Sequence, residues 1–118
     1  MDFRDQMKRR SKNIGIEIIK LIDDLPNKPA CWILSKQILR SSTSIGANYR
    51  AAYRAKSTRD FINKLKIVEE EADETIFWLE VLQESGMVSA STAEKLISET
   101  SEVLSIVVSS IKSSRKKQ

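Results

Sequence analysis

The stretch STRDFINKLKIVEEEADETIFWLEVLQESG, residues 57–86, decides the fold because it carries one helical repeat between a start signal and a stop signal. Apolar or small residues recur at steps of three and four, the spacing of one face of an α-helix. Ser57 with Asp60 resembles a capping box, and Ser85-Gly86 is a good C-terminal cap. We therefore predict a helix over 58–85. Its predicted buried stripe is Phe61, Leu65, Val68, Ala72, Thr75, Leu79 and Leu82.

Three further segments show the same period and are predicted to be helices over about 5–25, 29–56 and 90–113. The second begins at Pro29, because proline is favoured in the first helical turn. Short connections favour antiparallel neighbours, so we expect one all-α domain over 1–118, an up-down-up-down four-helix bundle. The buried faces expected in these helices are Met7, Ile14, Ile18, Leu21 and Leu25; Leu34, Ile38, Ser41, Ile45, Tyr49 and Ala52; and Ala93, Ile97, Thr100, Leu104, Val107 and Ile111.

The composition narrows the function classes. The 118 residues include one cysteine and no histidine. This excludes Ser-His and Cys-His nucleophile pairs and an ordinary zinc site, so we expect no enzyme, no cofactor and no metal. Cys31 suits a reducing cytosol and is expected to be a small buried helix residue. No apolar run reaches the roughly 20 residues of a membrane span, so we expect a cytoplasmic protein with no membrane partner.

The basic residues suggest a binding surface. The formal net charge is only +4. In the antiparallel arrangement, however, most Lys and Arg residues gather at the end that holds the N-terminus. Such a cluster is either ordinary solubilising surface or a platform for phosphates. Tyr49 and Tyr53 either stack on bases beside it or pack in the core. The candidate nucleic-acid-binding residues are Arg9, Arg10, Lys12, Arg50, Arg54, Lys56 and Arg59.

Two helices carry a second stripe outside their buried face. At 100° per residue, Lys36, Arg40, Ala47, Arg50 and Arg54 lie almost opposite the apolar face of their helix and are expected to point away from the core. An isolated protomer is expected to expose Ile67, Trp78 and Val81, which suggests a subunit interface. The candidate interface residues are Arg50, Arg54, Ile67, Glu71, Glu74, Trp78 and Val81. In this interface Glu71 and Glu74 would meet Arg50 or Arg54 of a neighbouring copy.

The acidic run VEEEADE, residues 68–74, has two interpretations. It could suggest carboxylate catalysis or metal binding. Glu70 and Asp73, however, point in different directions from Glu71 and Glu74 on a helix, so the run does not converge on one site. A solvated or ion-paired face is therefore the favoured interpretation.

Several motifs together resemble a known family. The chain contains SSTSIGAN followed by a basic segment, then S-T-x-D-F-I-x-K-L, then EEEADE-x-x-FWLE-x-L-x-E-x-G. This series of motifs looks like the four-helix-bundle family encoded in 23S ribosomal RNA intervening sequences. The resemblance implies homopentameric rings of antiparallel four-helix bundles. A related branch, the accessory variability protein of diversity-generating retroelements, binds nucleic acid and a reverse transcriptase through a basic surface. Only Arg50, Arg54, Lys56 and Arg59 match that basic segment.

Two functions remain open at this point. The first is a non-enzymatic homo-oligomer that binds RNA or DNA phosphates through its basic end, by backbone or shape rather than sequence. The second is a structural or adaptor ring that binds a protein partner, in which Arg50 and Arg54 serve mainly as interface ion pairs. Salt dependence separates the two, because phosphate binding falls steeply with salt.

Overall fold

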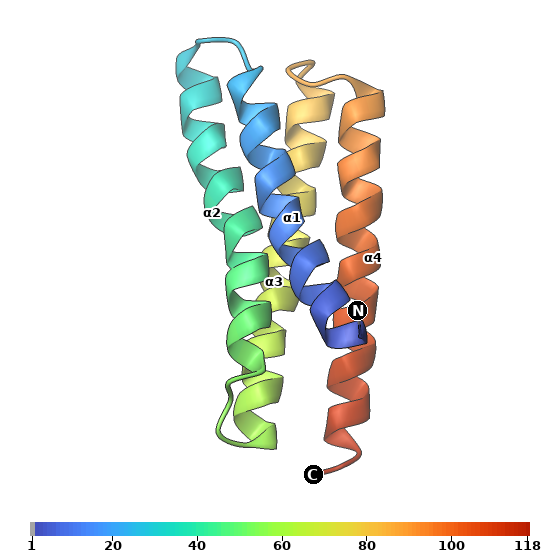
Figure 1. Cartoon of the computed structure of the whole chain (residues 1–118). Helices are drawn as coiled ribbons and strands as arrows, with labels where there is room; N and C mark the ends of the chain where they lie inside the picture. The colour runs from blue at the N-terminus through green and yellow to red at the C-terminus, as the bar shows by residue number, and fades with distance from the viewer. Residues whose placement is uncertain (1) are drawn as a thin grey trace.

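Four α-helices and no strand make up residues 2–118, the part of the chain that the computed structural model describes. The helices are α1 (Phe3–Asp23), α2 (Pro29–Ala52), α3 (Thr58–Glu84) and α4 (Ala90–Arg115). They lie side by side in a rod of 48 × 23 × 23 Å. The α1–α2 and α3–α4 connections lie at one end of the rod, and the α2–α3 connection lies at the other (Figure 1). None of the helices described is both long and apolar enough to cross a bilayer.

Side-chain caps fix three of the helix starts. Asp2 accepts a hydrogen bond from the backbone N–H of Asp5 at 2.8 Å, and Ser57 accepts one from Asp60 at 3.0 Å. At the start of α4, Ser89 accepts from Thr92 at 3.3 Å. Each cap satisfies an N–H group that has no partner inside its own helix. The Ser57 half of the capping box predicted for α3 is therefore present.

The end of α2 differs from the sequence prediction. The helix stops at Ala52 rather than near residue 56. Arg54 and Ala55 donate their N–H groups to carbonyls three residues back, which tightens the chain into a turn. Ser57 then takes an extended backbone and caps α3. The alanine-rich sequence of residues 51–55 favours a helix. The helix nevertheless ends at Ala52, because the chain must reverse direction here to begin α3.

The described core forms two clusters along the rod. One surrounds Tyr49, Val68 and Val107, and the other contains Ile18 and Leu79. Most of the predicted buried positions are indeed buried. The full buried sets are Met7, Ser11, Ile14, Gly15, Ile18 and Leu21 in α1; Cys31, Ile38, Ser41, Ser42, Ile45, Gly46, Tyr49 and Ala52 in α2; Ile62, Leu65, Val68, Ala72, Thr75, Leu79 and Leu82 in α3; and Ala93, Thr100, Val103, Val107 and Ile111 in α4.

Several details of the predicted buried faces are wrong. Leu25 and Leu34 are only partly buried and pack at the edge of the second cluster. In α3 the first buried position is Ile62, while Phe61 is only partly buried. In α4 Val103 is buried, while Ile97 and Leu104 pack at the edge of the clusters. Cys31 is buried as predicted, and its Sγ atom lies 3.6 Å from Sδ of Met87.

Small residues let α1 and α2 pack closely. A Cβ atom added to Gly46 would lie 2.7 Å from Cα of Lys12 and 2.9 Å from its backbone nitrogen, closer than atoms can pack. Gly15 in turn faces Thr43, whose methyl carbon would be 3.1 Å from an added Cβ. The segment Ser41–Ala47 is therefore a slim helix face.

Candidate nucleic-acid interface

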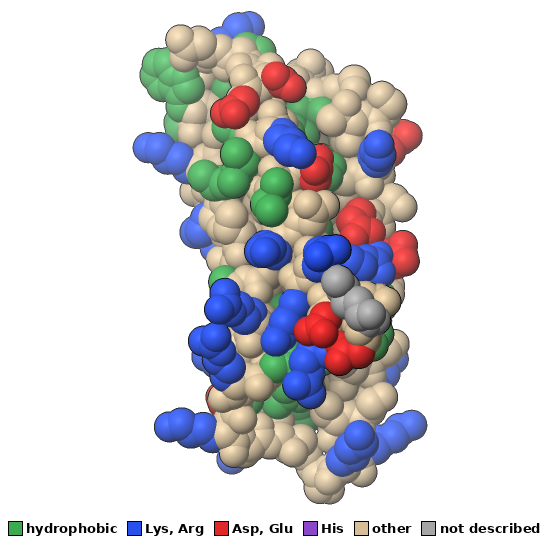
Figure 2. All heavy atoms as spheres, in the orientation of Figure 1, with side chains coloured by type: hydrophobic (Ala, Val, Ile, Leu, Met, Phe, Trp, Pro, Cys, Tyr) green, Lys and Arg blue, Asp and Glu red, His purple; other side chains and the backbone are tan. Residues whose placement is uncertain are grey.

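The close packing of α1 and α2 creates a basic groove on the surface. It has a volume of about 650 Å³. Its cations are Lys8, Arg9 and Lys12 from α1 and Arg50 from α2. Lysine or arginine side chains gather over the lower half of these two helices in Figure 2. The other residues that line the groove are Asp5, Thr43, Gly46 and Ala47.

The shape of the groove follows from its sequence. Lys8 and Lys12 stand one turn apart on α1, so their side chains emerge on the same side. Gly46 and Ala47 carry little or no side chain, which leaves open space between the cations. Within the described part of the chain, none of the four cations of the groove forms an ion pair. Asp5 is the single acid among the lining residues. The groove therefore offers several unpaired positive charges to an anionic ligand.

Arg10 was predicted to belong to this surface, but it faces the other way. Its guanidinium lies 2.7 Å from a carboxylate oxygen of Glu99 and 3.2 Å from one of Glu102, both on α4. The hydrogen bond to Glu99 raises the pKa of Arg10 above its ordinary value. The residue beside it, Arg9, points into the groove instead. Arg10 thus links α1 to α4 and leaves little charge for a ligand.

The remaining predicted cations lie nearer the α2–α3 connection. Arg54 and Lys56 belong to the turn itself. Arg59 lines a separate cleft of about 360 Å³ together with Lys66 of α3 and Arg115 of α4. The structure therefore brings Arg9, Lys12 and Arg50 together, and it separates them from Arg59.

Sequence reasoning missed two sets of cations. Lys8 lines the basic groove and was not among the candidates, although its spacing of four from Lys12 was a usable signal. The pairing of Lys66 with Arg115 had no local signal, because these residues are far apart in the chain.

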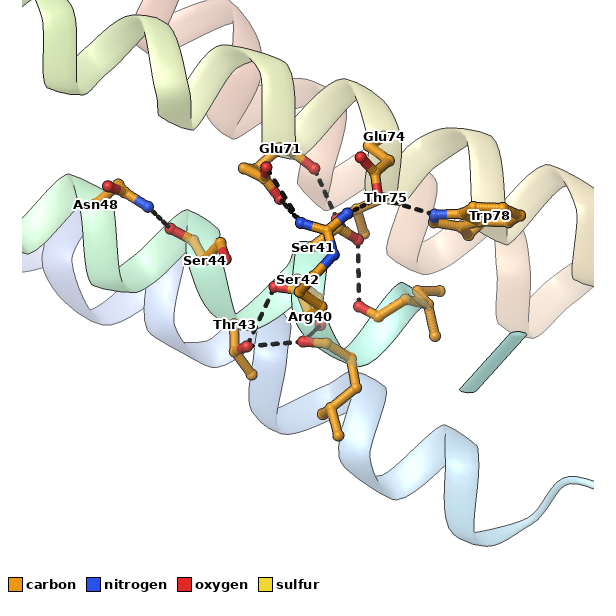
Figure 3. Close-up of polar contacts among 12 residues, drawn as sticks. Arg40, Ser41, Ser42, Thr43, Ser44, Asn48, Glu71, Glu74, Thr75 and Trp78 are labelled. Carbon is orange, nitrogen blue, oxygen red and sulfur yellow. Dashed lines mark hydrogen bonds and ion pairs between the residues drawn. The ribbon is translucent and has the colours of Figure 1, made fainter. Parts of the chain in front are cut away.

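Arg40 is exposed, as expected, but its side chain forms ion pairs within its own chain. It reaches from α2 across to α3, where it pairs with Glu71 at 3.2 Å and also with Glu74 (Figure 3). Glu74 in addition accepts a hydrogen bond from the indole N–H of Trp78 at 3.1 Å. The hydrogen bond to Glu74 raises the pKa of Arg40. Both carboxylates assigned to a neighbouring copy thus have a partner within their own chain.

The predicted apolar strip on α3 is exposed only in part. Ile67 is 36% exposed, whereas Trp78 and Val81 are partly buried. Trp78 packs against the core cluster that contains Leu79, which explains its lower exposure. The exposed aromatic residue of α3 is Phe77, whose ring is 5.0 Å from that of Trp78. The prediction that this strip forms a subunit interface stays a prediction.

The two tyrosines have different surroundings. Tyr49 is buried, and its hydroxyl lies 3.1 Å from that of Tyr53. Burial raises the pKa of the Tyr49 hydroxyl. Tyr53 is partly buried, and the guanidinium of Arg4 lies 4.4 Å from the centre of its ring. Tyr49 is therefore a core residue, which was one of the two interpretations of its sequence position.

The acidic run does not assemble a metal centre. Among residues 2–118, no group of three or more His, Cys, Asp or Glu side chains is arranged to hold a metal ion. Glu71 forms an ion pair with Arg40, and Asp73 is exposed. Glu69, Glu70 and Asp73 instead line a shallow surface cleft with Lys66.

The chain is similar to known proteins along most of its length. The family model described as 23S rRNA-intervening sequence protein matches residues 4–109. Similarity is also high to a crystal structure of a protein with unknown function from the S23 ribosomal protein family of Bacteroides thetaiotaomicron VPI-5482. The two chains share 40% sequence identity and a TM-score of 0.84, over 90% of this chain and 98% of that chain. No curated protein matches.

Proposed function

The chain belongs to the 23S rRNA-intervening sequence protein family, and from this premise we propose that it binds RNA or DNA and catalyses no reaction. The observation that supports this proposal most directly is the basic groove of α1 and α2, whose cations have no acidic partner in the described chain. Arg10 and Arg40 form ion pairs with acids of other helices, whereas Arg9, Lys12 and Arg50 form none within the described chain. What distinguishes these three from other unpaired surface cations is that they line one groove.

Binding in the groove would be electrostatic. A lysine or arginine that neutralises a phosphate releases condensed counterions, so the affinity depends strongly on salt. The groove presents charges and a small-residue floor rather than a helix or ribbon shaped for a DNA groove. Recognition is therefore of the backbone or of its shape rather than of base sequence. The proposal places the protein in the cytoplasm, on the basis of its single reduced cysteine.

The proposal also includes assembly. We propose that the chain is an up-down-up-down bundle and that copies form a homo-oligomeric ring, with five subunits as the family resemblance implies. The alternating positions of the connections in Figure 1 support the up-down arrangement. A ring would repeat the basic groove in each subunit. Several weak phosphate contacts would then act together by avidity.

Fluorescence anisotropy with a duplex RNA hairpin tests phosphate binding. We expect tight binding at low salt and a steep loss of affinity as salt rises. The triple variant Arg9→Gln/Lys12→Gln/Arg50→Gln should weaken binding at least about tenfold. It should also reduce the slope of log affinity against log salt by about 2–3, since each of the three lost phosphate contacts changes the slope by about 0.7–0.9.

A matched control separates the groove from net charge. The triple variant Lys28→Gln/Lys36→Gln/Lys95→Gln removes three exposed lysines that do not line the groove. Its affinity and salt slope should stay close to those of the unmodified protein. Equal losses in the two triple variants would contradict a specific role for the groove. Absence of binding even at low salt would contradict nucleic-acid binding altogether.

The second candidate function is an adaptor that binds a protein. The observation in its favour is the exposure of Ile16 and Ile19 on α1 and of Leu39 on α2. Exposed apolar patches of this kind mark interaction surfaces. Substitution of Ile16 and Ile19 by serine would leave RNA affinity unchanged if the protein acts through phosphates. It would remove partner binding if the protein is an adaptor.

A further inference from the structure

A second groove opens where α1 begins. Helix α1 starts at Phe3, short of the level at which α4 ends, so the last turns of α4 have no α1 beside them (Figure 1). The open groove at this place has a volume of about 570 Å³. Its aromatic residues are Phe3, Tyr53 and Phe61. We call it the aromatic groove.

The two walls of the aromatic groove differ in chemistry. One wall consists of aromatic rings, with Tyr53 and Phe61 in edge-to-face contact at 5.3 Å. The other wall is α4, which contributes Ile106 and a row of hydroxyls that includes Ser109 and Ser113. A flat ligand with an apolar face and a polar edge fits between such walls. A nucleobase has this chemistry, because every base combines a π-face with hydrogen-bonding edges.

The aromatic side chains are not equally available for stacking. The guanidinium of Arg4 already covers Tyr53 at 4.4 Å. Phe61 is partly buried in contact with Tyr53. Phe3 is 55% exposed, so its ring is the accessible one. Lys117 lines the same groove and supplies a positive charge there.

The aromatic groove adjoins the basic groove. Lys8 lines the basic groove, and its ammonium group lies 5.9 Å from the centre of the Tyr53 ring, which lines the aromatic groove. The two grooves therefore meet at the first turns of α1. A strand whose phosphates lie along the basic groove would bring its next nucleotide to the aromatic groove.

We propose that the aromatic groove binds one unpaired nucleobase of a nucleic acid whose phosphates occupy the basic groove. Phe3 stacks on the base, the serine hydroxyls of α4 contact its polar edge, and Lys117 faces the adjoining phosphate. This inference rests on the proposed function and specifies its ligand: a nucleic acid with an unpaired nucleotide beside a helical stem. A fully paired stem cannot offer this base, because its bases stay stacked inside the duplex.

Two RNA hairpins test the proposal by fluorescence anisotropy. They share one stem sequence, and one of them carries a single bulged adenine. We expect the unmodified protein to bind the bulged hairpin about tenfold more tightly, the scale of one base stacked on an aromatic side chain. Phe3→Ala should lose this preference while binding the paired hairpin unchanged.

The chain offers a matched control for Phe3→Ala. Phe77 on α3 is 53% exposed and does not line the aromatic groove, so Phe77→Ala removes the same group elsewhere and should keep the tenfold preference. A second variant, Ser109→Phe, fills the groove from an exposed position of α4 and should also abolish the preference.

Three results would overturn the proposal. Equal affinity for the two hairpins would show that the aromatic groove binds no base, while the proposal of phosphate binding would remain supported. Equal loss of preference in Phe3→Ala and Phe77→Ala would also overturn it. Failure to bind either hairpin at low salt would overturn both this inference and the proposed function.

Discussion

Gly46 sets the distance between α1 and α2, and its lack of a side chain is a packing requirement rather than a conformational one. At an exposed helix position Gly→Ala usually raises the free energy of unfolding by up to about 1 kcal/mol. An added methyl group at Gly46 would meet the backbone of Lys12 at 2.7 Å. We expect Gly46→Ala to lower the free energy of unfolding by about 1–3 kcal/mol in urea denaturation.

Gly15→Ala provides the comparison, since its nearest obstacle is the methyl group of Thr43 at 3.1 Å, which belongs to a side chain. Gly15→Ala should lower the free energy of unfolding by less than Gly46→Ala does. A Gly46→Ala protein at least as stable as the unmodified chain would contradict the close helix approach and, with it, the origin of the basic groove.

Because the Tyr49 hydroxyl is buried, we expect the free energy of unfolding to depend on pH. Burial raises the pKa of its hydroxyl, whereas a tyrosine in the unfolded chain loses its proton near pH 10. Above about pH 10 the unfolded state therefore binds fewer protons than the folded state. The free energy of unfolding should fall as pH rises through this range, by up to about 1.4 kcal/mol per pH unit from this residue. Below pH 10 the contribution is constant.

The Tyr49→Phe variant isolates this effect, because phenylalanine has no proton to lose. Urea denaturation of both proteins between pH 7 and pH 11 should show a constant stability difference up to about pH 10. Above about pH 10 the free energy of unfolding of the unmodified protein should fall relative to that of Tyr49→Phe. A difference that stays constant over the whole range would mean that the Tyr49 hydroxyl ionises equally in the folded and unfolded states.

At the scale of helices, the pairing of α2 with α3 contains one buried polar contact. The hydroxyl of Thr75 lies 2.9 Å from that of Ser41 and 2.8 Å from the carbonyl oxygen of Glu71, and both side chains are buried (Figure 3). We expect Thr75→Val and Ser41→Ala each to lower the free energy of unfolding by about 1 kcal/mol, the usual worth of such a bond.

The double variant should cost less than the sum of the two single variants, because both single changes remove the same contact. Ser110→Ala is a suitable control, since Ser110 is partly exposed and its hydroxyl donates to the carbonyl oxygen of Ile106 in its own helix. Its effect should stay within about 0.5 kcal/mol. Fully additive losses would show that Ser41 and Thr75 do not interact.

The sequence predicts the presence of the helices and their buried faces well. It predicts less well where each helix ends and which helix each side chain contacts. The period of α3 identified six of its seven buried residues, but it placed Phe61 where Ile62 is buried. The error lies in the first turn of the helix, where Phe61 is partly buried and packs edge-to-face against Tyr53 of the preceding turn. The family resemblance drawn from residues 41–86 is confirmed by the match over residues 4–109.

The candidate site was less predictable, because adjacent residues on one helix meet different neighbours. Arg9 and Arg10 are 100° apart on α1, so one lines the groove with α2 and the other pairs with Glu99 on α4. Which side faces which helix depends on how the bundle is wound, and no local pattern encodes that. The contact from Arg40 to Glu71 and Glu74 was missed for the same reason.

At the scale of the whole molecule, the two ends of the rod carry different chemistry. The basic and aromatic grooves lie in the half that contains the α2–α3 connection. Exposed apolar residues such as Trp32 and Ile33 lie near the α1–α2 connection at the other end. Ligand binding and contacts between proteins can therefore occupy separate surfaces of one chain.

The proposed ring makes a prediction about mass in solution. Trp78 was the natural residue to substitute on sequence grounds, but it is partly buried and hydrogen-bonded to Glu74, so its loss would also weaken the protomer. Ile67 is the cleaner choice, because it is 36% exposed. If α3 forms the subunit interface, Ile67→Ser should lower the mass measured by light scattering while circular dichroism shows unchanged helix content.

Leu39→Ser makes the corresponding change on α2, where the side chain is 37% exposed. It should keep the assembled mass if subunits meet through α3, because Leu39 lies one helical turn before Thr43, the residue of α2 that faces Gly15 of α1. The opposite result, assembly lost in Leu39→Ser and kept in Ile67→Ser, would move the interface to the α1–α2 face. That outcome would also bring subunit contacts close to the basic groove, and the salt dependence of RNA binding would then have to be measured on the dissociated Leu39→Ser protein.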